Sequence, residues 1–437
     1  MDEHERQRIL DWFDANRRHT ADLFASIRPE AYYLRPIPLR QPIIFYEGHF
    51  AAFNHMTLVL RALGKEPFAP ELDELFERGI DPETPEEAKQ ADAKWPDRDT
   101  VRDYVSRSDA EVRHALERDV LVDDENPLLV GAQAVYTILE HEPMHHETLR
   151  YMFHRLPHDM KIAPQQLRVE LGSEPPERET VVVPEGRVTL GAPVGQPAFA
   201  WDNEFGQTEV DVGELEVDVY NVTNRDFLEF IEEGGYRRRE LWSDEGWEWL
   251  QESGTQHPMF WEQRNDRWEW RGMYDFYELP LAWPVYVTQA EASAWAAWKG
   301  RRLMTEPELH RVAYGQPDGG ERLQPWGDDP PDSSRGNFDF LSPEPFPVGS
   351  FPAGRSTWGI HDLVGNGWEW TASLFGPFPG FREMAPYPPY SSDFFDEKHF
   401  VLKGASPATS RKLVRRTFRN WFRPTYPYMY ATFRTVR

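Results

Sequence analysis

Cysteine is absent from all 437 residues of this chain. Its absence excludes disulfides, thiolate metal ligands and cysteine nucleophiles together. Any bound metal must therefore be held by His, Asp, Glu or water. Such ligands favour iron, manganese or zinc over a sulfur cluster.

Positive charge and long apolar runs are also scarce. The formal net charge of -26 at pH 7 argues against general affinity for nucleic acid or anionic membranes. No apolar run approaches the roughly 20 residues that a membrane-spanning helix needs. The opening MDEHERQRILDWF is charged and amphipathic, which leaves no room for the apolar core of a signal peptide. We therefore expect a cytoplasmic protein that binds neither nucleic acid nor membranes.

The length and the sequence patterns favour two domains. Residues 1–165 have helical periodicity, whereas the remainder alternates short strand-like runs with Gly, Pro, Asn and Asp. We predict a helical domain at 1–165 and an α+β domain at 166–437. The second domain is expected to contain helices over residues 224–232 and 289–298.

Four helical segments are expected in the first domain. One lies near the N-terminus, and the others cover residues 43–64, 99–118 and 128–156. The acidic residues 66–100 read as a long surface loop. Four helices joined in this way predict an up-and-down four-helix bundle, whose facing helices can build a metal site. Pro143 is expected to kink the last helix.

The stretch EHEPMHHE, residues 140–147, carries candidate metal ligands. In a helix His141 and His145 project from one face, as two imidazoles that bind one metal do. A stable site needs at least a third protein ligand, and His49 in an earlier helix is the candidate. His55 lies six residues from His49 and does not share its face, so only one of the two is expected to bind.

Three side chains near this stretch are not expected to bind the metal. Glu147 is expected to support the helix or a ligand. His146 and His154 are expected either to orient a ligand or to lie on the surface, because an imidazole beside a ligand more often orients than coordinates.

The last 37 residues contain nine Lys or Arg and neither Asp nor Glu. In so acidic a chain this reversal has two interpretations. The cations can form ion pairs with the acidic remainder, or they can line a positive pocket for carboxylate substrates.

Several stretches of the second domain resemble the formylglycine-generating-enzyme-like, sulfatase-modifying-factor fold, a C-type-lectin-like α+β domain. They occur in the order expected for that fold: VPEGRVTLG (183–191), WDNEFG (201–206), VTNRDFLEFIEEGGY (222–236), WKGRRLMTEPELHRVAYG (298–315), RGNFDF (335–340), GIHDLVGNGWEWT (359–371) and the terminal RNWFRP and ATFRTVR. Formylglycine generation itself is not expected, because the copper-dependent enzymes of that branch work through a cysteine pair.

The first domain looks like a DinB-like bundle, and its fusion to such a fold resembles the sulfoxide synthases of ergothioneine biosynthesis, which are non-haem iron enzymes. The motifs GHF at 48–50 and HxxxHxE at 141–147 carry this resemblance. It implies Fe(II) held by His49, His141 and His145, with O2 as a substrate. It also implies a bond between a cysteine-type thiol and imidazole C2 of Nα-trimethylhistidine (hercynine), with oxidation to the sulfoxide.

The same resemblance implies substrate-binding residues. Asn420 and Trp421 match a hercynine-binding strand. Met144 stands where many relatives have a Gln that contacts hercynine, and Phe422 stands where some have an Asp that helps to hold γ-glutamylcysteine. We therefore expect free cysteine as the thiol donor, with γ-glutamylcysteine second.

A tyrosine near the iron acts as a proton donor in such relatives. Tyr387 and Tyr390 both match it, and the sequence does not choose between them. A phenol must come within hydrogen-bond distance of the reacting oxygen to act in this way.

A structural Ca²⁺ is a further expectation. In relatives it binds near the segment that matches residues 366–370, NGWEW. Backbone carbonyls with the side chains of Asn366 and Glu369 would suit this ion.

Three alternative functions stay open. A selenoneine synthase would use a selenosugar and hercynine on the same scaffold. A metal-dependent thiol or sulfur transferase would use the three histidines with zinc and no redox chemistry. A lectin-like binding module with a structural metal would leave those histidines without a role.

Overall fold

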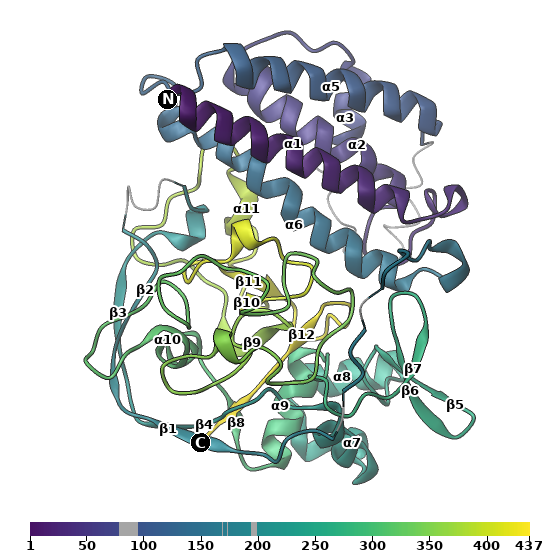
Figure 1. Ribbon diagram of the computed structural model, residues 1–437, viewed down its shortest axis with the longest axis vertical. Helices are drawn as coiled ribbons and strands as arrows, with labels where there is room; N and C mark the ends of the chain where they lie inside the picture. The colour runs from purple at the N-terminus through teal and green to yellow at the C-terminus, as the bar shows by residue number, and fades with distance from the viewer. Residues whose placement is uncertain (78–94, 168, 173, 194–198) are drawn as a thin grey trace. The chain divides into compact units, whose positions relative to one another are not determined.

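The chain forms two compact units, which are coloured by residue number in Figure 1. The computed structural model describes residues 1–437 except 78–94, 168, 173 and 194–198. Unit 1 contains Met1–Gln165 and Met384–Pro388, and unit 2 contains Gln166–Glu383 and Pro389–Arg437. The short piece Met384–Pro388 therefore belongs to the N-terminal unit, although it lies far along the chain.

Unit 1 is a helical bundle (Figure 1). Side-chain caps begin two of its long helices, because Asp2 accepts from Glu5 N at 2.7 Å and Asp97 accepts from Thr100 N at 2.8 Å. The predicted bundle is confirmed. The longer helices in its described part are α1 (Glu3–Ala25), α2 (Ile43–Asn54), a π-helix (His55–Ala62), α3 (Pro70–Phe76), α5 (Arg98–Arg118) and α6 (Gln133–Arg155).

The loop predicted over residues 66–100 is wrong near its start, where a helix occurs, whereas the helix predicted over residues 99–118 is present. Helix α3 occupies Pro70–Phe76, and α5 begins at Arg98. Pro70 starts α3 in a position where its missing N–H costs nothing, and Asp73 lies in the first turn, where acidic side chains favour a helix. Residues 78–94 of the predicted loop lie outside the described residues.

Helix α6 begins later than predicted and continues through its proline. Gly131 and Ala132 both have a φ of 59°, so the helix starts only after them. Pro143 removes the N–H that would bond to the carbonyl of Leu139, and Asn16 Nδ2 of α1 donates to that carbonyl at 2.9 Å instead. No helix in the described ranges is long and apolar enough to cross a membrane.

Unit 2 contains four small sheets in its described part. The first has the strand order β1-β4-β13-β8, the second β11-β10-β9-β12, the third β2-β3 and the fourth β5-β6-β7. Strand β12 is parallel to β9, and the other pairs are antiparallel. The strands are β1 (Thr180–Val183), β2 (Gly186–Leu190), β3 (Thr208–Val212), β4 (Leu215–Asp218), β5 (Trp261–Arg264), β6 (Arg267–Arg271), β7 (Phe276–Glu278), β8 (Arg302–Leu303), β9 (Gly367–Leu374), β10 (Phe400–Ala405), β11 (Asn420–Phe422), β12 (Ala431–Thr432) and β13 (Thr435–Val436).

Helices also occur in unit 2, in agreement with the predicted α+β class. Helices α7 and α9 have the bounds predicted from the sequence, and α8, α10 and α11 are additional. Threonine capping boxes at Thr223, Thr288 and Thr305 begin α7, α9 and α10. The α-helices in the described part of the unit are α7 (Asn224–Glu232), α8 (Asp244–Ser253), α9 (Gln289–Trp298), α10 (Glu306–Tyr314) and α11 (Pro389–Ser392).

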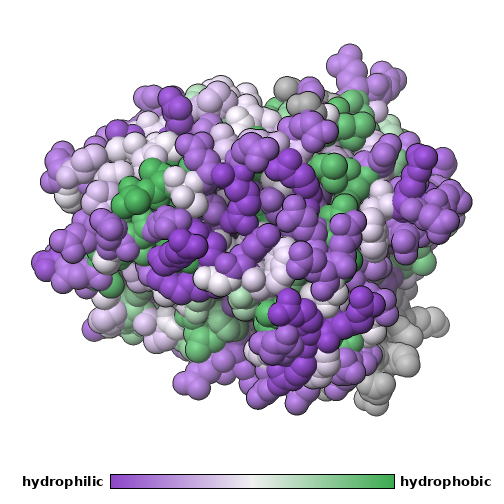
Figure 2. All heavy atoms as spheres, turned by 90° about the horizontal axis from the view of Figure 1, so that it is seen from below, coloured by the Kyte–Doolittle hydropathy of each residue, from purple (hydrophilic) through white to green (hydrophobic). Residues whose placement is uncertain are grey.

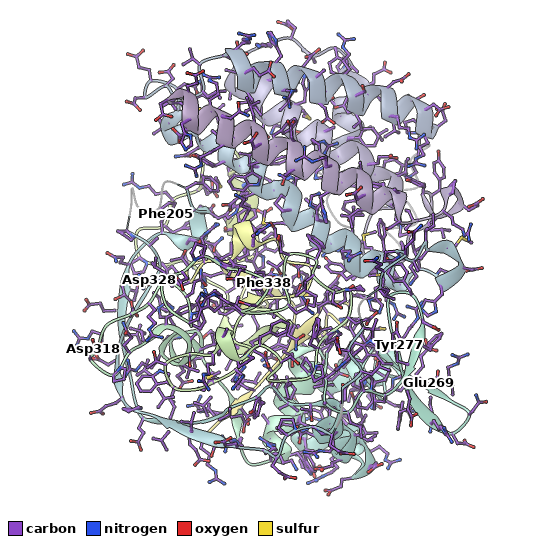
Figure 3. The ribbon with its side chains drawn as sticks, viewed as in Figure 1. Phe205, Glu269, Tyr277, Asp318, Asp328 and Phe338 are labelled. Carbon is purple, nitrogen blue, oxygen red and sulfur yellow. The ribbon has the colours of Figure 1, made fainter. Side chains whose placement is uncertain are left out.

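Aromatic side chains fill much of the interior of unit 2. The buried Phe338 and the exposed Asp318 are both labelled in Figure 3. On the face drawn in Figure 2, hydrophilic residues predominate and hydrophobic ones occur in scattered small groups. The largest fully buried side chains of the unit include Trp201, Trp261, Trp270, Trp283, Trp295, Trp368 and Trp370.

The basic C-terminal residues form ion pairs inside unit 2. Arg434 is fully buried, and its Nη2 lies 2.6 Å from Glu369 Oε1. These pairs favour the ion-pair interpretation of the basic tail over the pocket for carboxylate substrates. The cations that pair with carboxylates of the unit are Lys403, Arg411, Arg415, Arg416, Arg419, Arg423, Arg434 and Arg437.

A buried carboxylate joins the helices of unit 1. Glu142 of α6 accepts hydrogen bonds from Arg17 at 2.7 Å and Thr20 at 2.5 Å on α1, and from Asn54 at 3.2 Å on α2. Arg17 also donates to Asp109 of α5 at 2.9 Å. Burial by itself would raise the pKa of Glu142, but Arg17 and the hydrogen bonds outweigh it and lower the pKa to about 2. Glu142 is therefore an anion whose partners come from neighbouring helices.

Glu142→Gln is expected to lower the free energy of unfolding of unit 1 by about 3 kcal/mol, because it removes one partner of a buried ion pair. Urea unfolding followed by far-UV circular dichroism measures the change. Glu117→Gln is the matched control, since it removes an exposed pair with Arg113 and should cost less than about 1 kcal/mol. Equal losses in the two variants would contradict this role for Glu142.

Candidate metal centre

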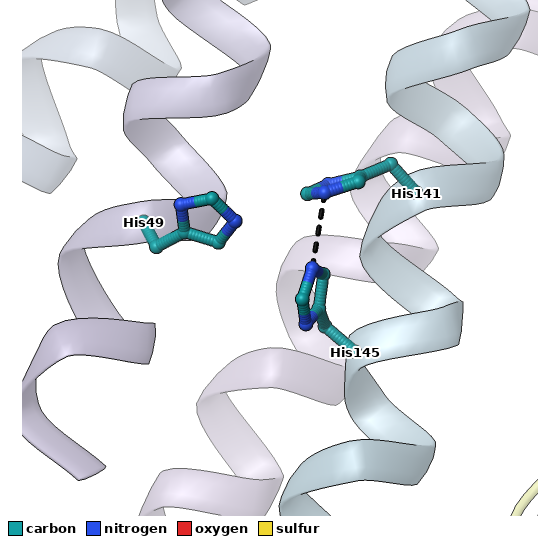
Figure 4. Close-up of side chains that lie close together, drawn as sticks. All are labelled: His49, His141 and His145. Carbon is teal, nitrogen blue, oxygen red and sulfur yellow. Dashed lines mark hydrogen bonds between the residues drawn. The ribbon is translucent and has the colours of Figure 1, made fainter. Parts of the chain in front are cut away.

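Three histidines of unit 1 converge from two helices (Figure 4). His49 comes from α2, and His141 and His145 come from one face of α6. One nitrogen from each lies within 4.8 Å of the others. Among the described residues, this is the one group of three or more His, Asp or Glu side chains that meets this distance.

The nitrogen atoms of the three imidazoles fit a metal. Nδ1 of His49 lies 2.9 Å from the carbonyl oxygen of Phe76, so Nδ1 carries the proton and Nε2 keeps its lone pair. Nε2 of His141 lies 3.0 Å from Nε2 of His145. Two ligands at right angles, each about 2.1 Å from one ion, are separated by about 3.0 Å. The pair on α6 can therefore fill adjacent positions on one metal.

The surroundings keep the imidazoles neutral. Burial lowers the pKa of His49 to about 4, although the hydrogen bond to Phe76 opposes it. Burial first, and then the neighbouring histidines, lower the pKa of His141 and of His145 well below the usual value. The neutral form of each ring, which is the form that binds metals, therefore predominates at pH 7.

Phenylalanines of α2 pack against the imidazoles. Phe53 stacks on His141, with ring centroids 3.5 Å apart and planes 12° apart. Phe45 stacks on His49, with centroids 4.8 Å apart. These rings restrict rotation of the two imidazoles and exclude water from one side of each.

Gly48 allows α3 to approach α2 closely. A Cβ at this position would lie 2.5 Å from the ring of Phe76. Phe76 is fully buried, so its ring cannot move aside without disturbing the core. Glycine at position 48 therefore permits the contact that brings the Phe76 carbonyl to His49.

The other side chains considered as ligands or supports, which are His55, His146, His154 and Glu147, lie outside the three-histidine group. Nε2 of His55 lies 3.0 Å from Glu111 of α5. His146 and His154 are both buried, so the surface alternative is wrong for each of them. Glu147 is also buried.

The two candidate tyrosines differ in their surroundings. Tyr387 belongs to unit 1, where its ring centroid lies 6.1 Å from that of His141 and 5.3 Å from that of Phe53. Tyr390 belongs to unit 2 and stacks on Trp201 with centroids 4.0 Å apart. Of the two, Tyr387 is the one that contacts the histidine group within a single unit.

The predicted substrate residues occur in both units. Met144 is half-buried on α6, directly before His145. Asn420, Trp421 and Phe422 make up strand β11 of unit 2 and are also half-buried. The indole of Trp421 stacks on Phe375, with centroids 4.1 Å and planes 6° apart. Their roles in substrate binding stay predictions.

Side chains in the segment predicted to bind Ca²⁺ have protein partners. The amide of Asn366 accepts from the N–H of Phe346 at 2.8 Å and donates to its carbonyl at 2.9 Å. Glu369 forms the buried ion pair with Arg434. These contacts do not favour Ca²⁺ ligation by either side chain, and Ca²⁺ stays a prediction.

Sequence reasoning missed the residues that support the ligands. Phe45, His49 and Phe53 follow one another at intervals of four, and this spacing would have shown that they share a face of α2. Phe76 has no such signal, because it lies 27 residues from His49 and meets it through a backbone carbonyl.

Comparisons with known proteins agree with both predicted fold types. Residues 168–437 match the sulfatase-modifying factor enzyme 1-like domain, and residues 13–149 match the DinB superfamily. Hercynine oxygenase from Mycolicibacterium thermoresistibile is 30% identical over 97% of this chain and 90% of that protein. Hercynine oxygenase from Mycolicibacterium smegmatis is 30% identical over 89% of each. Ergothioneine biosynthesis protein 1 from Schizosaccharomyces pombe is 28% identical over 93% of this chain and 53% of that protein.

His141→Ala is expected to abolish stoichiometric binding of Fe(II), because two imidazoles do not complete a stable set of protein ligands. Anaerobic titration with Fe(II), followed by desalting and metal analysis, measures the bound iron. His154→Ala is the control, since it removes another buried histidine of α6 and should leave one iron per chain. Stoichiometric iron in His141→Ala would refute the ligand assignment.

Proposed function

The chain belongs to the sulfoxide synthase family of ergothioneine biosynthesis, and from this premise we propose that it is a non-haem Fe(II)- and O2-dependent enzyme that joins a thiol to hercynine. As a member of this family it is an oxidoreductase of the ergothioneine pathway. The proposed reaction forms a bond between the sulfur of cysteine and imidazole C2 of hercynine and oxidises that sulfur to the sulfoxide.

The observation that carries the proposal is the group of His49, His141 and His145, of which the first two are buried and the third is half-buried. Three neutral imidazoles leave about three of six octahedral positions for substrates. Iron bound there would supply the redox chemistry with O2 that the reaction needs. The reaction balances, because one thiol, one imidazole C–H and one O2 give one sulfoxide and one water. Both hydrogens and all four electrons are accounted for.

We propose that the hydroxyl of Tyr387 donates a proton during the reaction. Support comes from its position beside His141 within unit 1. A phenol can serve as this donor if the substrate oxygen comes within hydrogen-bond distance.

We propose that the substrates are recognised by Met144 on α6 and by Asn420, Trp421 and Phe422 on β11. Support comes from the motif matches and from the half-buried state of all four side chains. Because Phe422 lacks the carboxylate that helps to hold γ-glutamylcysteine in some relatives, free cysteine is the first choice of donor and γ-glutamylcysteine the second. A selenosugar, which would make the enzyme a selenoneine synthase, is the third. We also propose a cytoplasmic location.

The iron-loaded protein is expected to consume O2 with hercynine and cysteine and to form their sulfoxide. Anaerobic reconstitution with Fe(II), addition of O2, and mass spectrometry of the products measure this. Parallel reactions contain γ-glutamylcysteine or a selenosugar in place of cysteine. Absence of O2 consumption with every donor would refute the oxidative proposal. Product formation with zinc and no O2 would instead favour a thiol transferase.

Tyr387→Phe is expected to lower the rate of sulfoxide formation by about 100-fold, which is the lower end of the usual effect of a general acid. Tyr390→Phe is the control, because it removes the same hydroxyl from a ring that stacks on Trp201 in unit 2. Stopped-flow mixing with O2 followed by product analysis measures both rates. The assignment to Tyr387 fails if Tyr390→Phe has the larger effect.

A further inference from the structure

A second group of titratable side chains lies in unit 1 outside the histidine group. Asp73 of α3 is buried, and one of its oxygens accepts a hydrogen bond from the hydroxyl of Tyr104 on α5 at 2.5 Å. The same oxygen lies 3.8 Å from Nδ1 of the buried His55. Nε2 of His55 lies 3.0 Å from Glu111. The proposed reaction uses none of these groups.

We propose that Asp73 and Tyr104 are positioning residues that orient His49 through helix α3, and this inference rests on the proposed metal site. The C-terminal end of α3 connects these two residues to His49. Phe76 is the last residue of α3, and the last four carbonyls of a helix lack donors within it. The carbonyl of Phe76 is therefore available to accept from Nδ1 of His49. The position of α3 thus sets where this acceptor lies.

Tyr104 secures α3 in two ways. Its hydroxyl donates to Asp73 in the first turn of the helix, and its ring packs on Phe76 in the last turn, with centroids 5.8 Å apart. The same ring of Phe76 also fits against Gly48 of α2. Helix α3 has only seven residues, which is too short for a helix to be stable without such contacts. Loss of the Tyr104 hydroxyl should therefore loosen the helix.

Loss of the Tyr104 hydroxyl should affect only one of the three histidines, His49. Nδ1 of His141 and Nδ1 of His145 are buried and have no hydrogen-bond partner among the described protein groups. His49 is therefore the one member of the histidine group whose outer nitrogen, Nδ1, has a hydrogen-bond acceptor among the described protein groups. An acceptor on the outer nitrogen fixes the ring and raises its basicity as a ligand. A shift of α3 would reach the metal through His49.

Tyr104→Phe tests this inference in the full chain, because it removes only the hydroxyl that holds Asp73. We expect the Kd for Fe(II) to rise about tenfold, the lower end of the usual effect of residues that support metal ligands. Tyr136→Phe is the matched control, since its hydroxyl donates to Glu5 at 2.9 Å at another site in the same unit. Anaerobic competition with a chelator measures the Kd of both variants and of the wild type.

A spectroscopic measurement separates positioning from general loss of stability. In the zinc-loaded protein with ¹⁵N-labelled histidine, the Nδ1 proton of His49 should exchange slowly with solvent, because it is hydrogen-bonded and buried. Tyr104→Phe should speed the exchange of this one proton, and Tyr136→Phe should not. The proton signal that is missing from the spectrum of His49→Ala is assigned to His49.

The conservative variant Asp73→Asn is compared with Asp73→Ala to test whether an acceptor for Tyr104 is what matters at this position. Its amide oxygen can still accept from Tyr104, so it should weaken Fe(II) binding less than Asp73→Ala does.

The inference is overturned if the two tyrosine variants have equal Kd values or if the exchange of the His49 proton is unchanged in Tyr104→Phe. If the wild-type protein binds no Fe(II), the proposed function fails first, and the exchange measurement still tests the link from Tyr104 to His49.

Discussion

The charge on Glu142 is the constraint on which the helical unit depends. A buried anion without partners costs several kcal/mol, so the helices must pack in a register that brings donors to it. Arg17 and Thr20 on α1 and Asn54 on α2 meet this requirement. Glu142 immediately follows the ligand His141 on α6. The register that satisfies the carboxylate therefore also fixes which face of α6 is turned toward α2.

The basic C-terminal residues serve unit 2 in the same way. Arg434 and Arg419 are almost fully buried, and each pairs with a glutamate from another part of the unit. Such pairs specify which segments meet, because a wrong partner would leave a charge buried alone. The positive charge of the tail is thus used within the fold.

Features set by neighbouring residues could be predicted from the sequence, and features set by distant ones could not. The spacing of His141 and His145 and the bounds of α7 and α9 follow from local patterns. Helix α10 could have been found as well, since Thr305 begins it with the same capping box that begins α7 and α9. The meeting of Phe76 with His49 depends on how α3 packs, and no periodicity in the sequence encodes that contact. The ion-pair partners of the tail were beyond prediction for the same reason.

Because Met384–Pro388 groups with the helices, unit 1 is a discontinuous domain. A fragment that ended at Gln165 would contain His49, His141 and His145 but would lack Tyr387, which packs on Phe53 and His141. Residues 1–165 alone would therefore lack one wall of the histidine group, and residues 384–388 supply it from much later in the chain.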